Sequence, residues 1–143
     1  MTLDEALSEL RARAQLGRAE QMAAYHKVER PYLGVANPDT DALVRHWRKQ
    51  IDLDTRLRLA ADLWNTNIFE ARVAASKLLT QARIKPSDEA AWQLIQSWVP
   101  DFDSWAIADH ACMAGQRRLT ADRLRGDVQQ LGRPLIPSCL ATF

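Results

Sequence analysis

Apolar side chains recur along most of the chain at intervals of three and four residues, the period of an amphipathic helix. The first such stripe contains Leu3, Ala6, Leu7 and Leu10. The same period predicts helices that contain residues 22–25 and 43–51, and helices that span residues 55–64, 69–84, 88–99 and 105–118. No segment of useful length alternates between apolar and polar residues as a strand does. The pattern therefore predicts an all-α fold.

The predicted helices are separated by residues that break or cap helices. Pro31, Gly34 and Pro38 fall close together and predict a loop over residues 29–39. Residues 65–67 and 85–87 read as short turns, and Pro100 ends the helix before it. Side chains that can accept hydrogen bonds from the free N–H groups of a first helical turn follow the breaks. The predicted N-caps are Asp39 or Thr40, Ser87, and Asp101 or Asp103.

The helices group into antiparallel hairpins of about 33–40 residues, the size of the repeats in an α-solenoid. A single amphipathic pair cannot bury its apolar face alone, so we expect about three pairs to stack on one another. Residues 120–131 can form a further helix, but the end of the chain contains two prolines and no helical period. We therefore divide the chain into a helical domain, 1–119, and a divergent helix with an irregular tail, 120–143.

The composition fits a folded domain in the cytoplasm. The chain has 143 residues, of which 47% are hydrophobic and 26% are charged, enough for one core. The formal net charge of +1 neither supports nor excludes a nucleic-acid partner, because acidic residues elsewhere can balance the charge of a basic surface patch. No apolar run approaches the roughly 20 residues of a membrane span. Cys112 and Cys139 have no ligand-like spacing, which favours a reducing compartment.

Three segments, in order, resemble the AlkD-like DNA alkylation repair enzymes, which are HEAT-like repeat DNA glycosylases. The first is MAAYHKVERPYLGVANPDTDALVRHWRK at residues 22–49, with its Met-x-x-Tyr group, Leu-Gly-Val loop and following proline. The second is LWNTNIFEARVAASKLL at residues 63–79, and the third is FDSWAIAD at residues 102–109, with a Trp-x-x-x-Asp pair. The resemblance covers roughly residues 1–119.

The resemblance implies a HEAT-like solenoid whose basic surface holds duplex DNA containing alkylated bases. It implies removal of positively charged N3- or N7-alkylated purines by cleavage of the N-glycosidic bond, without flipping the lesion into a deep pocket and without a cofactor. The implied site residues are Trp105 and Asp109, and Tyr25 matches an aromatic residue near the DNA-facing surface. Relatives of this kind run longer and carry a second tryptophan in later helices, whereas no tryptophan follows Trp105 here. We therefore expect a truncated, frameshifted or divergent short member that is marginally stable or self-associates through an uncapped solenoid end.

The spacing of Trp105 and Asp109 also has a physical meaning of its own. Residues four apart lie on one helix face, one turn from each other. Loss of a cationic base builds positive charge on the deoxyribose, which a fixed carboxylate and the electron-rich face of an indole stabilise. Because the base leaves as a neutral molecule, one carboxylate can suffice where ordinary glycosidases need two. Asp109 can act by stabilising the positive charge on the sugar or by orienting the attacking water.

Each candidate residue also has a plainer interpretation. Trp105 can be a core residue with Asp109 solvated, and Tyr25 can be a half-buried core residue. Arg117 and Arg118 are candidates for phosphate contacts, or ordinary solvated residues of a helix. The Asp-His-x-Cys run at 109–112 spreads its side chains over different faces of a helix, so no metal site is predicted. The alternative function is a non-catalytic HEAT-like module that binds DNA or a protein.

Overall fold

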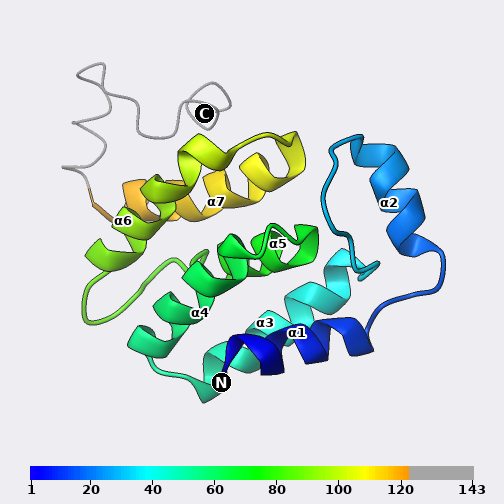
Figure 1. Ribbon diagram of the computed structural model, residues 1–143. Coiled ribbons are helices and arrows are strands. Elements are labelled where there is room, and N and C mark those ends of the chain that lie inside the picture. Colours follow the sequence, from blue (N-terminus) through cyan, green and yellow to red (C-terminus); the bar gives the residue numbers. More distant parts are fainter. Residues whose placement is uncertain (123–143) are drawn as a thin grey trace.

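A computed structural model describes residues 1–122 of the chain (Figure 1). In this range the chain is built from helices only, which confirms the all-α fold class. The helices are α1 (Leu3–Ala12), α2 (Arg18–His26), α3 (Asn37–Gln50), α4 (Leu53–Asn65), α5 (Phe69–Leu78), α6 (Glu89–Trp98), the short 3₁₀ helix η1 (Val99–Asp101) and α7 (Trp105–Ala121).

The helices stack as three pairs in two layers, as in a helical solenoid. The pairs are α1 with α3, α4 with α5, and α6 with α7. Helices α1, α4 and α6 follow one another in one layer, and α3, α5 and α7 follow one another in the second. Helix α2 interrupts the first pair, buries none of its residues, and stands beside the second layer (Figure 1). Helix α5 lies at the centre and buries every residue except Lys77.

The core contains four of the five tryptophans. Trp47, Trp64, Trp92 and Trp98 are each at most 4% exposed, as their apolar stripes predicted. The rings of Trp64 and Trp98 stack with their centroids 4.5 Å apart, which joins α4 to α6. The fifth tryptophan, Trp105, lies outside this core.

Several predicted helix ends differ from the structure, and two of them have clear local reasons. Helix α3 begins at Asn37, so Asp39 and Thr40 lie inside its first turn and neither is its N-cap. Pro38 fits in that turn because the missing N–H has no partner there in any case. Helix α5 ends at Leu78 and not at Ile84. The Thr80 hydroxyl donates to the Ser76 carbonyl over 2.7 Å, which satisfies that carbonyl without another helical turn.

Other expectations fall at the edge of the described residues or beyond it. Helix α7 runs to Ala121, past the domain boundary predicted after residue 119, and the tail from residue 123 lies outside the described part. Cys112 is disulfide-bonded, so the cysteine spacing no longer supports a reducing compartment, while Cys139 lies outside the described residues. Within residues 1–122 no helix is both long enough and apolar enough to span a membrane.

Candidate functional site

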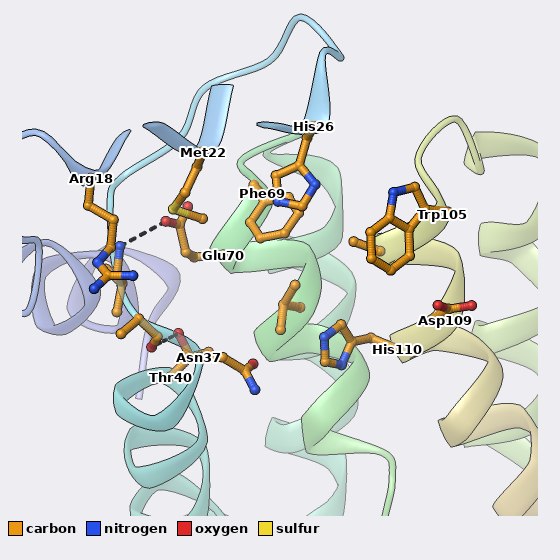
Figure 2. Close-up of a pocket in the computed structure, with 14 residues that line it drawn as sticks. Arg18, Met22, His26, Asn37, Thr40, Phe69, Glu70, Trp105, Asp109 and His110 are labelled. Atoms are coloured by element: carbon orange, nitrogen blue, oxygen red, sulfur yellow. Dashed lines mark hydrogen bonds between the residues drawn. The ribbon is translucent and has the colours of Figure 1, made fainter. Parts of the chain in front are cut away.

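Trp105 and Asp109 lie together on the exposed side of the first turns of α7. The side chain of Trp105 is 62% exposed, and Asp109 is exposed one turn later. Both line a cleft of about 310 Å³ that opens between α2, α3, α5 and α7 (Figure 2). The predicted common face of these two residues is therefore open to a ligand and is not packed into the core.

The cleft has apolar walls and a polar rim. Its apolar lining includes Met22, Val35, Ala36, Phe69, Val73 and Ala106. Arg18, Asn37, Asp109 and His110 stand at different points of its edge, and Figure 2 shows Asp109 on the same side as Trp105. One carboxylate therefore lies next to one indole beside a largely apolar hollow.

The segment that precedes Trp105 is held by two side chains from earlier elements. The indole N–H of Trp64 donates to the carboxylate of Asp101 over 2.9 Å. The guanidinium of Arg30, whose side chain is 1% exposed, forms an ion pair with Asp103. The predicted N-cap role of these two aspartates is wrong, because Ser104 occupies the N-cap position of α7. Their bonds instead fix the place at which α7 begins.

On the opposite side of the cleft, Glu70 in the first turn of α5 holds the loop before α3. Its buried carboxylate accepts the backbone N–H groups of Leu33, Gly34 and Val35 over 2.8–2.9 Å. Gly34 has a φ of +87°, and a Cβ there would lie 2.9 Å from the backbone nitrogen of Ala19. The Leu-Gly-Val loop and Glu70 are thus parts of one contact, which the sequence pattern alone did not predict.

Aromatic rings from three elements surround the mouth of the cleft. Tyr25 is 68% exposed, and its ring centroid lies 6.5 Å from that of Trp105, so its interpretation as a half-buried core residue is wrong. The His26 ring lies 4.5 Å from Phe69 and 6.4 Å from Trp105. Burial lowers the pKa of His26, and the charge of Arg30 lowers it further. The imidazole beside Trp105 is therefore neutral at neutral pH.

The model of the DNA alkylation repair enzyme family matches residues 6–134 of the chain. The chain belongs to that family. No curated protein and no solved structure matches it significantly. The family match runs to residue 134, beyond the range of roughly 1–119 that the resemblance of the three segments predicts.

In this DNA alkylation repair family member, His110 follows Asp109 and separates the cleft from a second hollow. Burial lowers the pKa of His110, and the Lys77 ammonium lowers it further. The carboxylates of Asp109 and Asp41 oppose this shift without reversing it. A neutral His110 leaves the carboxylate of Asp109 without an imidazolium partner.

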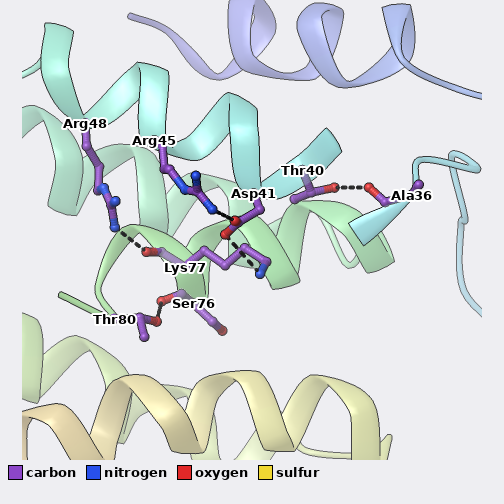
Figure 3. Close-up of polar contacts among 8 residues, drawn as sticks. All are labelled: Ala36, Thr40, Asp41, Arg45, Arg48, Ser76, Lys77 and Thr80. Carbon is purple, nitrogen blue, oxygen red and sulfur yellow. Dashed lines mark hydrogen bonds and ion pairs between the residues drawn. The ribbon is translucent and has the colours of Figure 1, made fainter. Parts of the chain in front are cut away.

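The second hollow is basic and lies along the same layer of helices. Arg48, Lys77 and Arg117 line it, and one acidic residue, Asp41, lies among them. The ammonium of Lys77 is 3.4 Å from the carboxylate of Asp41, which also pairs with Arg45 (Figure 3). The guanidinium of Arg48 reaches the carbonyl of Lys77 (Figure 3). The family member thus places several cations in a hollow that His110, the residue after Asp109, also lines.

Two predicted phosphate-binding residues that are neighbours in sequence have opposite environments. Arg117 is exposed and lines the basic hollow. Arg118 is fully buried, donates to the carbonyl of Gln81 and lies 3.6 Å from the carboxylate of Asp88. The expectation that Arg118 contacts DNA is therefore wrong, since its guanidinium holds the connection between α5 and α6. Within residues 1–122 no three His, Cys, Asp or Glu side chains are grouped to hold a metal ion.

Proposed function

We propose that this family member removes cationic N3- or N7-alkylated purines from duplex DNA by hydrolysis of the N-glycosidic bond. The family match supports a role in DNA alkylation repair. The observation that carries the proposal is the exposed pair of Trp105 and Asp109 on one face of α7, beside an open cleft.

The chemistry needs few groups because the leaving base already carries a positive charge. As the bond between C1′ and the purine nitrogen breaks, its electron pair stays with the base, which leaves as a neutral molecule. Positive charge then develops on the sugar, where the carboxylate of Asp109 and the indole face of Trp105 stabilise it. A water adds to C1′ and loses a proton, completing the hydrolysis. Asp109 is placed to orient that water as well.

The surroundings of the pair fit a DNA duplex. Tyr25 extends the exposed aromatic surface next to Trp105, where it can contact sugar or backbone. Arg117, and Arg48 deeper in the basic hollow, lie further along the same layer and can neutralise phosphates. Along α7 the indole of Trp105 is followed by the carboxylate of Asp109 and then by the cation of Arg117. This order suits a DNA backbone that crosses the helix.

The test is release of 7-methylguanine or 3-methyladenine from alkylated duplex DNA. The Asp109→Asn variant should lose about 10²–10³-fold in single-turnover rate, the usual cost of removing one transition-state charge contact. Duplex binding should persist, because asparagine keeps the shape of the side chain. Asp54→Asn, at an exposed position in the first turn of α4, is the matched control and should retain the wild-type rate.

A wild-type rate in Asp109→Asn would refute the assigned role. If the unaltered chain releases no base yet binds duplex DNA in a salt-sensitive way, the non-catalytic DNA-binding alternative is correct. If it neither releases base nor binds DNA, the remaining alternative is a module that binds protein.

A further inference from the structure

Helix α2 is only loosely attached to the two layers of helices. None of its nine residues is buried, and within residues 1–122 it packs as a pair with no other helix. Figure 1 shows α2 standing beside the stacked pairs. Its half-buried residues form one narrow stripe along the helix, which consists of Arg18, Ala19, Met22 and His26. A segment with so few buried contacts costs little to move as a unit.

The chain is held in place on both sides of α2. Before the helix, the backbone N–H of Gln15 donates to the carbonyl of Gly34 over 2.9 Å, in the loop that Glu70 holds. After the helix, the buried guanidinium of Arg30 pairs with Asp103. Helix α2 is therefore a strap between two fixed points, and a movement of the strap leaves the rest of the fold in place.

The residues that flank the strap are suited to act as hinges. Gly17 has a φ of +80°, and a Cβ there would meet nothing within 4 Å. Lys27 has a φ of +59°, a left-handed conformation that is unfavourable for a residue with a Cβ. Residues at the ends of a moving element absorb its change in backbone angles, and an outward swing of the strap can release Lys27 from this conformation.

The contacts that hold the strap against the other helices are opposed by an unsatisfied polar atom. Met22 packs on the core, and the ring of His26 lies 4.5 Å from the ring of Phe69 between centroids. The Nδ1 atom of His26 is buried in this position and has no hydrogen-bond partner among the described residues. Water would satisfy that atom once the strap swings outward. These opposing contributions allow two positions of similar free energy.

The position of the strap decides the shape of the candidate site. In the closed position Met22 and His26 form part of the cleft wall, and both side chains point from α2 toward α5 (Figure 2). The ring of Tyr25 then lies 6.5 Å from the ring of Trp105 between centroids. An outward swing would widen the cleft and separate Tyr25 from Trp105.

We propose that α2 is a hinged strap that opens and closes over the cleft, and that its closed position completes the aromatic surface beside Asp109. The movement is a property of the chain whatever ligand it binds. That duplex DNA selects the closed position rests on the proposed function, because the duplex would contact Tyr25 and Trp105 together. A ligand shifts such an equilibrium only by as much as it prefers one of the two positions.

The test measures the distance between nitroxide labels on the strap and on α7 by pulsed electron paramagnetic resonance. The labels are attached at Ala24→Cys and Thr120→Cys, both at exposed positions, without a reductant so that the disulfide of Cys112 stays intact. We expect two distances, with roughly one molecule in ten in the longer, open arrangement. The matched pair His46→Cys and Thr120→Cys joins α3 to α7 and should give one distance.

A second arm loosens the strap. Met22→Gln keeps the length of the side chain but removes an apolar contact, so it should raise the ratio of open to closed molecules about fivefold. Met113→Gln makes the same change at an exposed position of α7 away from the strap and should leave the ratio unchanged. Saturating duplex DNA should lower the ratio about fivefold through its contacts with Tyr25 and Trp105.

The results separate the strap from the proposed function. Two distances that respond to Met22→Gln and not to Met113→Gln support the strap, even if the chain releases no base from DNA. One distance in both the unaltered sequence and Met22→Gln overturns the strap, even if base release is observed. Equal shifts in the two methionine variants also overturn it, because the whole fold would then be loosened. If duplex DNA binds without changing the ratio, the selection of the closed position by DNA is refuted.

Discussion

Replacement of Glu70 by alanine should strongly destabilise the protein, because it leaves three backbone N–H groups without their acceptor. Two of these hydrogen bonds, to Gly34 and Val35, are fully buried, and the third, to Leu33, is partly buried. An orphaned buried donor costs about 1–3 kcal/mol, so the two buried groups alone predict a loss of about 2–6 kcal/mol. The free energy of unfolding of a domain of this kind is roughly 5–15 kcal/mol in total, so the loss is a large part of it.

Urea unfolding followed by circular dichroism measures this loss. Glu70→Ala should lower the unfolding midpoint without changing the slope, since the surface exposed on unfolding stays the same. The unfolding midpoint of Glu70→Gln should lie between those of Glu70→Ala and the unaltered protein. Its side-chain amide keeps one oxygen acceptor but turns an NH₂ group toward a backbone donor. Glu20→Gln, on an exposed position of α2, is the matched control and should stay within about 0.5 kcal/mol of the unaltered protein.

A free energy of unfolding for Glu70→Ala within about 1 kcal/mol of the unaltered protein would refute the reasoning. It would mean that water or a shifted loop satisfies these N–H groups at little cost. The position of the Leu33–Val35 loop would then not depend on Glu70. Some other contact would have to hold Val35 in the wall of the cleft.

Three further predictions concern residues of the second layer of helices. Burial lowers the pKa of His110 below its ordinary value of 6.5, so the unfolded chain takes up the proton first and the unfolding free energy falls as the pH drops below 6.5. His110→Gln should flatten this dependence of the urea midpoint on pH, whereas His46→Gln, at an exposed position, should leave it unchanged; equal slopes in both variants would contradict the prediction. Arg117→Ser should reduce the salt dependence of duplex binding by about one unit of slope at constant stability. Arg118→Met should instead lower the unfolding free energy by about 3–5 kcal/mol, because it leaves the partner of a buried ion pair unpaired. A stability loss in Arg117→Ser together with a changed salt dependence in Arg118→Met would contradict both assignments.

The parts of the fold that depend on neighbours in sequence could be predicted from the sequence. Helical periodicity correctly placed the two later helix pairs and the buried tryptophans, because an apolar stripe must find a core, but it did not show that α1 would pair with α3 across the intervening α2. The common face of Trp105 and Asp109 is also local, since four residues make one helical turn. The interpretation of Asp101 and Asp103 as helix caps failed because their partners, Trp64 and Arg30, lie far away in the sequence.

The same reason explains the error at Arg118. Arg117 and Arg118 are neighbours in sequence and have the same charge, but successive residues point about 100° apart around a helix. Only the packing of the connection between α5 and α6 against α7 decides which of them faces the core, and that packing places Arg118 under the carbonyl of Gln81. Glu70 was invisible as a loop anchor for a similar reason, since nothing near it in sequence shows that Leu33–Val35 will meet it.

The exposure of Trp105 is the feature that the rest of the fold best explains. The chain buries four tryptophans almost completely, so an exposed indole at the start of α7 is not a sign of a weak core. The segment before it is held by the Trp64–Asp101 bond and the Arg30–Asp103 pair, and the facing loop is held by Glu70. Each of these contacts joins segments that are far apart in the sequence and so restricts the backbone to one arrangement on its side of the cleft. Both sides of the cleft are therefore fixed while its indole stays in contact with solvent, which is the arrangement that a preorganised binding site requires and that core packing alone does not.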